Sequence, residues 1–213
     1  MGFIEQVQGR LAHAQDFNEY KRLWPSYKLV DELGIARPKV YITIPKAEVN
    51  TLNWTQLRNR LPNLFVVRPS VFVNPIHDFM LRDDGHRGLM NFSVSNMQTP
   101  ANMLKDQAGY LNSIQDADIA TMFEEFPLTY EDRLGYPIHY RVHIFGGVIG
   151  CVQGNATNAN FWVDTDCKLL ASSNNNDVSS LIPNVGIMDD LCAASKSISL
   201  ASKLPYLRID FVS

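Results

Sequence analysis

The stretch PIHYRVHIFGGVIG, Pro137 to Gly150, predicts a β-hairpin. Apolar and polar residues alternate through its first half, so Arg141 and His143 would lie together on the face opposite the apolar side chains. Gly146-Gly147 then interrupts the pattern, and two glycines between extended runs are typical of a tight turn between paired strands. An Arg and a His on one sheet face suit an anion site, although the spacing alone favours a solvated polar face.

Composition limits the classes of protein that fit this chain. Its 213 residues, 46% hydrophobic and 19% charged, can form one domain or two small lobes around a real core. A net charge of −3 argues against a general nucleic-acid binder. No apolar run approaches the ~20 residues that span a bilayer, and the first residues lack the pattern of a signal peptide. The three cysteines have no ligand-like spacing, so we expect a cytoplasmic protein.

Periodicity divides the first part of the chain into helices and strands. The residues that end or begin helices are Asp16 and Ser26 as caps and Gly34 as a stop. Helices are expected at residues 3–14, 16–24, 26–33 and 46–61, and strands at residues 40–44 and 64–70.

The second part is expected to be richer in strands, and it contains no internal repeat. Turns are expected around Asp84-Gly85 and at residues 164–166, and loops at residues 154–160 and 172–180. Helices are expected at residues 99–122 and 186–202, and strands at residues 77–82, 88–96, 124–128, 139–145, 148–150, 161–163, 167–170 and 204–213.

Several of these pieces together resemble an ATP-grasp domain, in particular the teichuronopeptide-biosynthesis-like branch of that superfamily. The pieces, in chain order, are SYKLVDELGIARPKVYITI, NLFVVRP, FEEF, HYRVHIFGGVIG with FWVDTDCKLL, and LPYLRIDFV. They cover most of the chain from about Tyr27 onward, and their order and spacing carry the resemblance.

The resemblance implies an α+β fold of two lobes, each an antiparallel sheet flanked by helices. On this basis we expect an N-terminal helical segment over residues 1–34, a smaller lobe over 35–123 and a larger sheet lobe over 124–213. The larger lobe would lack the final strands that family members have.

The resemblance also implies a nucleotide site. Arg68 stands where the family has a basic residue, usually Lys, that touches the phosphates of the nucleotide. Glu124, Glu125 and Phe126 match the segment that joins the two lobes and holds adenine and ribose. The cofactors implied are ATP and Mg²⁺.

Two further positions are implied for the chemistry. Arg141 matches the conserved Arg of the family's DYR segment and is the expected catalytic residue, and Asp210 matches a magnesium-binding carboxylate. The implied activity is that of an ATP-dependent carboxylate–amine ligase with an acyl-phosphate intermediate. Its substrate would be a small-molecule carboxylate or a peptide- or sugar-linked one.

The acid of the family's DYR segment is replaced by His139. The sequence departs from the family in two further places. The phosphate loop, Ser70 to Pro75, contains no glycine, although close backbone approach to phosphate favours residues without Cβ. The sequence also stops three residues after Asp210, where family members continue into a strand with further magnesium ligands. The chain is therefore truncated, completed by a partner, or a catalytically inactive ATP-grasp-like binding or structural module.

A plain structural interpretation stands beside each residue. Arg68 would pair with a surface carboxylate, the two glutamates would form an acidic strand edge, and Asp210 would be an exposed strand-end acid. An α/β protein unrelated to nucleotides is a third hypothesis. His77, His86 and His139 do not form a ligand pattern.

The family hypothesis makes geometric predictions. Arg68, Glu125, Arg141 and Asp210 should line one cleft between two lobes, and ATP should bind weakly at best because the loop lacks glycine. Residues 205–213 should form a strand beside residues 140–145. That strand would leave an exposed sheet edge, which invites a partner chain or a second copy.

Overall fold

The computed structural model describes residues 23–71, 79–85, 88–91, 96–115, 118–126, 138–156, 159–173 and 177–212. The helices expected at residues 3–14 and 16–22, and most of the glycine-free loop, lie outside these ranges. Contacts divide the chain into two compact units. One unit is Lys21–Ser26 with Arg37–Phe126, called the six-stranded unit here; the other is Met1–Tyr20, Tyr27–Ala36 and Pro127–Ser213, called the five-stranded unit.

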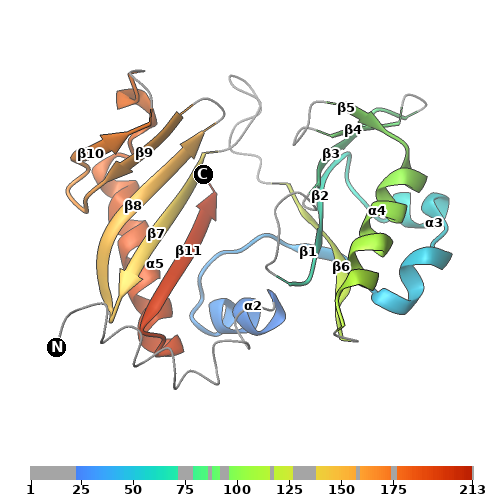
Figure 1. Ribbon diagram of the computed structural model, residues 1–213, viewed down its shortest axis with the longest axis horizontal. Coiled ribbons are helices and arrows are strands. Elements are labelled where there is room, and N and C mark those ends of the chain that lie inside the picture. Colours follow the sequence, from blue (N-terminus) through green and yellow to red (C-terminus); the bar gives the residue numbers. More distant parts are fainter. Residues whose placement is uncertain are drawn as a thin grey trace. The chain divides into compact units, whose positions relative to one another are not determined.

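The six-stranded unit is built on an antiparallel sheet with the strand order β1-β6-β2-β3-β4-β5 (Figure 1). Its strands are β1 (Val40–Pro45), β2 (Leu64–Pro69), β3 (Phe79–Asp83), β4 (Leu89–Asn91), β5 (Asn96–Gln98) and β6 (Ala120–Glu125). Its helices are the 3-10 helix η2 (Lys46–Thr51), α3 (Trp54–Arg58) and α4 (Pro100–Ser113).

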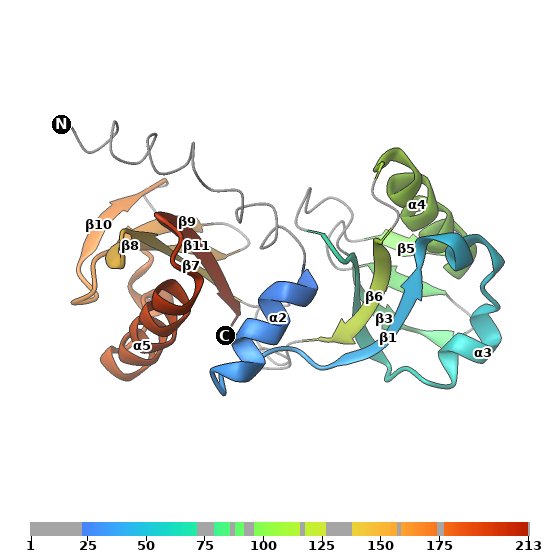
Figure 2. The same cartoon turned by 90° about the horizontal axis from the view of Figure 1, so that it is seen from below.

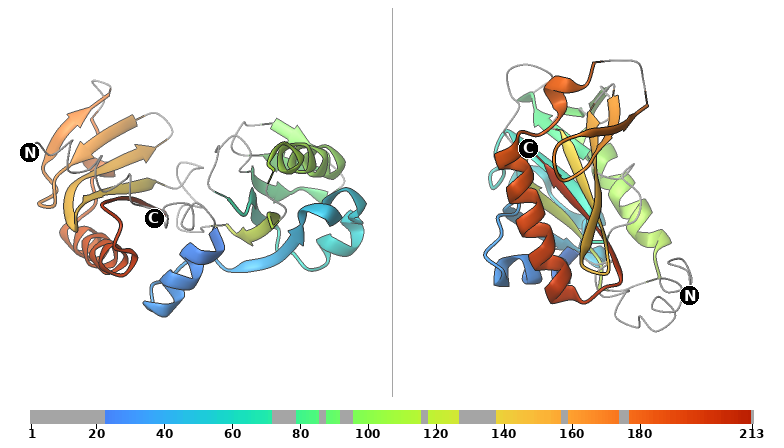
Figure 3. Two further views of the ribbon diagram at one scale, coloured as in Figure 1. Left: turned by 60° about the horizontal axis from the view of Figure 1, so that its bottom comes forward. Right: turned by 90° about the vertical axis from the view of Figure 1, so that its left-hand side faces the viewer.

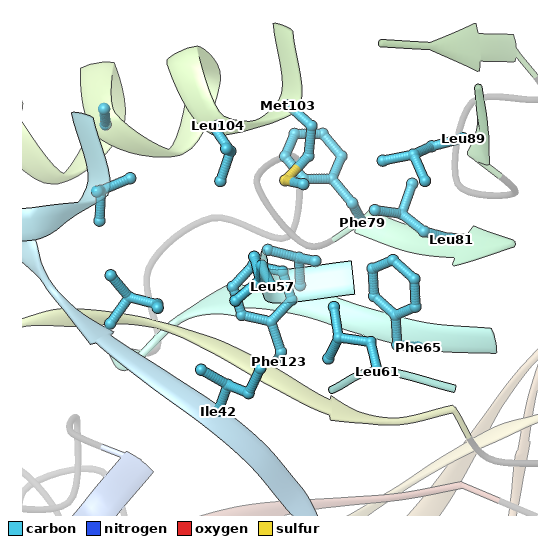
Figure 4. Close-up of a cluster of buried hydrophobic side chains, with 14 of the residues drawn as sticks. Ile42, Leu57, Leu61, Phe65, Phe79, Leu81, Leu89, Met103, Leu104 and Phe123 are labelled. Carbon is cyan, nitrogen blue, oxygen red and sulfur yellow. The ribbon is translucent and has the colours of Figure 1, made fainter. Parts of the chain in front are cut away.

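One face of this sheet packs against helices and forms the core of the unit. Figure 4 shows Met103 and Leu104 of α4 facing Phe79 and Leu81 of β3. Full burial of one such side chain contributes about 1.5–3 kcal/mol, so this layer accounts for much of the stability of the unit. Thr99 fixes the start of α4, because its hydroxyl accepts the N–H of Asn102 at 3.2 Å.

Three expectations for this unit were wrong. The helix expected at residues 46–61 is broken into η2 and α3, because Asn53 leaves the helical backbone and caps α3. The helix expected at residues 99–122 ends at Ser113, and β6 already begins at Ala120. The strand expected at residues 88–96 is divided between β4 and β5, which pair with each other.

The five-stranded unit is built on a second antiparallel sheet, with the strand order β10-β9-β8-β7-β11. Its strands are β7 (His139–Phe145), β8 (Val148–Ala156), β9 (Ala159–Val163), β10 (Leu169–Ser172) and β11 (Tyr206–Val212). Its helices are most of α2 (Leu23–Glu32), η5 (Ser179–Leu181) and α5 (Val185–Ser202). Helix α2 ends just before Gly34 as expected, but it begins before Ser26 and includes Pro25 in its first turns.

The hairpin predicted from Pro137–Gly150 is confirmed. Gly146 and Gly147 have φ values of 58° and 86°, which favour glycine, and Phe145 pairs with Val148 across the turn. The second strand is longer than predicted and runs to Ala156, so the loop expected at residues 154–160 was wrong. Gly154 lies inside it because a Cβ there would come within 2.0 Å of the Phe161 ring.

Helix α5 covers one face of this sheet (Figure 2, Figure 3). Met188 and Leu191 of α5 belong to the same buried cluster as Val142, Ile144 and Phe161. The strand predicted at the end of the chain is confirmed, because β11 pairs with β7 from Tyr206↔Phe145 to Val212↔His139.

The chain is therefore an α+β protein with two antiparallel sheets flanked by helices, as the sequence predicts. Each sheet packs against helices of its own unit on one face. We call the other face the open face, whatever its exposure, and Arg68, Glu124, Arg141 and Asp210 lie on it. Within the described ranges, no helix has the length and apolar character needed to cross a membrane.

Candidate functional site

In the six-stranded unit, Arg68 and Glu124 form an ion pair on the open face. Val66 of β2 lies opposite Glu124 of β6, so Arg68, two residues further along, is on the same face as Glu124. Arg68 Nη1 lies 3.7 Å from Glu124 Oε2. The side chain of Glu124 is only 1% exposed, and a carboxylate this buried requires a charged or hydrogen-bonding partner.

Glu125 points to the other face and has a different role. Its Oε2 accepts the backbone N–H of Lys39 at 3.1 Å, and its own N–H donates to the Lys39 carbonyl at 2.8 Å. Burial, and then the charge of Glu125, raise the pKa of the Tyr41 phenol. Phe126 follows and is buried. The sequence reasoning left Glu124 and Glu125 equivalent, whereas strand alternation places only Glu124 beside Arg68.

In the five-stranded unit, Asp210 lies between two arginines on the open face. Arg141 of β7 and Asp210 of β11 are register partners, with Nε and Oδ2 3.6 Å apart. Arg208 donates from Nε to Oδ1 at 2.9 Å and from Nη2 to Oδ2 at 3.2 Å of the same carboxylate. Such a planar, two-bond contact is the geometry that guanidinium groups favour with carboxylates.

The neighbouring polar groups on this face are His143, Tyr206 and Gln153. His143 Nδ1 and the Tyr206 hydroxyl are 3.0 Å apart, and the two rings stack. Burial is the main cause that lowers the pKa of His143, and Arg208 and Arg141 lower it further against the opposing effects of Gln153 and Asp210. The imidazole is therefore neutral at pH 7. Burial raises the pKa of Tyr206, so its hydroxyl remains protonated.

The Asp210 carboxylate does not fit the role of an isolated Mg²⁺ ligand in its present setting. Both of its oxygens accept hydrogen bonds from Arg208, and Arg141 adds a second positive charge. Mg²⁺ binds oxygen ligands in an octahedral shell and is repelled by adjacent cations. Among the described residues, no group of three or more His, Cys, Asp or Glu side chains could hold a metal ion. This donor set favours an anion.

The predicted site residues thus occur as two pairs, one inside each unit: Arg68 with Glu124, and Arg141 with Asp210. The expectation that they line one cleft stays a prediction. The sequence analysis assigned no role to Arg208, Tyr206 or Gln153. The signal for Arg208 was present, because side chains two residues apart on a strand lie on one face.

Comparison with known proteins finds similar folds among solved structures. No protein-family model and no curated protein sequence matches the chain. A crystal structure of D-alanine–D-alanine ligase from Bacillus anthracis matches with a TM-score of 0.55 and 16% identity, over 91% of this chain and 52% of the ligase. The same ligase complexed with ATP matches with a TM-score of 0.52 and 17% identity, over 91% and 51%.

A third structure, the ATP-grasp ligase PsnB complexed with the precursor peptide PsnA2 and AMPPNP, has a TM-score of 0.39 and 12% identity, over 92% of this chain and 46% of that one. The first two matches show the fold alone: the chain shares with these structures an α+β architecture, the fold class predicted from the sequence. The chain spans about half the length of these ligases.

Proposed function

We propose that this chain is an ATP-dependent carboxylate–amine ligase-like protein whose arginines hold the phosphates of ATP. The observation that carries the proposal is the cluster of Arg141, Asp210 and Arg208 on the open face of the five-stranded sheet. It occurs in a fold shared over most of the chain with ligase structures, one of them complexed with ATP. Two guanidinium groups on one face match the charge and shape of phosphate groups.

In the proposed reaction, the γ-phosphoryl group of ATP moves to a substrate carboxylate oxygen. The bond to ADP breaks and an acyl phosphate forms. An amine then attacks the acyl carbon, forms the C–N bond, loses a proton and expels inorganic phosphate. We assign Arg141 and Arg68 to the phosphates, because such a transfer depends mainly on positioning and charge neutralisation.

The other predicted residues have supporting roles in this proposal. Glu124, buried against Arg68, orients that guanidinium group, and the backbone near Glu125 and Phe126 contacts the nucleoside. We assign the substrate to small-molecule or peptide- or sugar-linked carboxylates and the protein to the cytoplasm. The resemblance to the teichuronopeptide-biosynthesis-like branch supports the first assignment, and the three cysteines without ligand-like spacing support the second.

A specific observation favours the second candidate function, a catalytically inactive ATP-grasp-like binding module. Arg208 occupies both oxygens of Asp210, and the described residues contain no cluster of metal ligands. Such a chain would bind a nucleotide or another anion without transferring phosphate.

Calorimetry with ATP, followed by an assay for ADP release with a panel of carboxylates and amines, tests both candidates. We expect ATP to bind with a Kd above 1 μM, which corresponds to a favourable binding free energy smaller than about 8 kcal/mol. Arg141→Ala should abolish this binding, whereas the control Arg82→Ala, at an exposed arginine outside the proposed site, should keep it. Binding with ADP release supports the ligase, and binding without it supports the module. No binding at millimolar ATP contradicts the ligase and any module that binds ATP.

A further inference from the structure

We propose that Asp210 positions Arg141 and Arg208 instead of binding a metal, and that the open face of the five-stranded sheet thereby binds a phosphate group without a divalent cation. The inference rests on the proposed function for the identity of the natural ligand, ATP. The phosphate site itself is argued from the residues of this face alone.

The first step is the fork between Arg208 and Asp210. Its two hydrogen bonds, at 2.9 and 3.2 Å, join side chains two residues apart on one strand. Two bonds to one planar carboxylate fix the orientation of the guanidinium plane better than a single contact can. The Nη1 group of Arg208 takes no part in this fork, and its N–H donors are available to a ligand on the same face.

The second step concerns Arg141, which lies close to Asp210 but donates no hydrogen bond to it from Nε. Its Nε is buried, lies 3.6 Å from Asp210 Oδ2, and has no hydrogen-bond acceptor in the described structure. A separation of 3.6 Å is too long for a hydrogen bond, although the charges still attract. A buried N–H without an acceptor is costly, so Asp210 alone does not satisfy the Arg141 guanidinium group. The side chain is 28% exposed, which leaves part of this cation accessible to an anion.

The third step is the charge of the whole sheet. Its five strands contain two arginines, no lysine and a single acidic residue, Asp210. His143, opposite Arg208 in the register, is neutral at pH 7 and engaged with Tyr206. Gln153, the register partner of Arg141 on β8, contributes a neutral amide that can donate to an anion. The net positive charge attracts phosphate and opposes Mg²⁺.

The six-stranded unit offers a matched control for this arrangement. Arg82 donates from Nε to Asp84 Oδ1 at 2.7 Å and from Nη2 to Oδ2 at 3.2 Å, the same fork at the same spacing. Substitutions at Arg82 and Asp84 therefore remove an equivalent exposed contact in the other unit.

The experiment is calorimetric titration of the full chain with pyrophosphate in EDTA. We expect measurable binding, weakened at least ten-fold by Arg141→Ala and by Arg208→Ala and unchanged by Arg82→Ala. Asp210→Ala should weaken binding at least three-fold, whereas Asp210→Asn, which keeps an acceptor for Arg208, should restore it to within three-fold of the wild type. A merely structural role for Asp210 would not produce this difference in variants with equal melting temperatures.

Two outcomes overturn the proposal. One is the absence of pyrophosphate binding in EDTA. The other is ATP binding that requires Mg²⁺ and is abolished by Asp210→Asn. That second result would make Asp210 a metal ligand, and the proposed function would still hold. Pyrophosphate binding in EDTA without any ATP binding would remove the proposed function and leave this inference intact. A melting curve of each variant identifies any that fails to fold, and for such a variant Arg→Lys replaces Arg→Ala.

Discussion

The two units contain ion pairs of nearly the same geometry in different surroundings. Arg68 and Glu124 are 3.7 Å apart, and Arg141 and Asp210 are 3.6 Å apart, in each case between neighbouring antiparallel strands. The Glu124 side chain is 1% exposed and the Asp210 side chain 38%. A buried pair is costly to break, whereas an exposed pair can exchange its partner for a ligand. The exposure of the carboxylate, and not the distance between the charges, therefore distinguishes the two pairs.

The largest effect should follow removal of residues 205–213, which takes away Asp210 together with its strand. Strand β11 pairs along the length of β7, and Leu207, Ile209 and Phe211 pack against the core of the unit. At about 1.5–3 kcal/mol for each fully buried side chain, the loss amounts to several kcal/mol. We expect the five-stranded unit to unfold, measured by circular dichroism and urea denaturation. A shortened chain that melts cooperatively at the wild-type temperature would contradict this.

The next largest effect should come from breaking the buried pair. Arg68→Ala leaves the Glu124 carboxylate buried without its arginine, which should lower the free energy of unfolding by about 3–5 kcal/mol. Urea denaturation measures this loss. The double variant Arg68→Ala, Glu124→Gln should recover part of it, because the amide carries no charge. If the loss in the double variant equals the sum of the losses in Arg68→Ala and Glu124→Gln, the two side chains are not coupled.

Breaking the exposed pair should have a much smaller effect on stability. Asp210→Asn removes the charge from a half-exposed carboxylate, and such pairs contribute about 0–1 kcal/mol. The same urea titration should therefore shift little, while pyrophosphate binding reports on the site. A loss as large as that of Arg68→Ala would remove the contrast between the two pairs.

The smallest effect should be a pH dependence from His143. Its pKa in the folded protein lies below the ordinary value of 6.5, chiefly because of burial, so the unfolded chain takes up the proton first as the pH falls. The resulting stability is present above about pH 6.5 and is lost at lower pH. We expect the urea midpoint of the wild type to fall more between pH 7.5 and 5.5 than that of His143→Gln. Parallel curves would contradict this.

The parts of the fold that were predicted correctly have strong local signals. Alternation and two glycines define the β7–β8 hairpin, and alternation alone defines β11. The start of β6 was missed because a central strand is buried on both faces, and its residues Ala120–Phe123 form an apolar run that suits a helix equally well.

The candidate site was only partly predictable for a similar reason. Periodicity shows that Glu124 and Glu125 point in opposite directions, but it does not show which side holds the core. The burial of Phe123 against α4 decides this, and it depends on contacts distant in sequence. The fork of Arg208 with Asp210 was within reach of sequence reasoning, whereas the approach of Arg141 requires the pairing of β7 with β11.

The five-stranded unit is discontinuous in the chain, and this affects how the protein folds during synthesis. Its segment Tyr27–Ala36 is made before Arg37–Phe126, and the five strands of its own sheet are translated only after that long insertion. The six-stranded unit can therefore complete its core on the ribosome before the sheet of the five-stranded unit has been synthesised. Closing that long separation makes the five-stranded unit the slower of the two to fold.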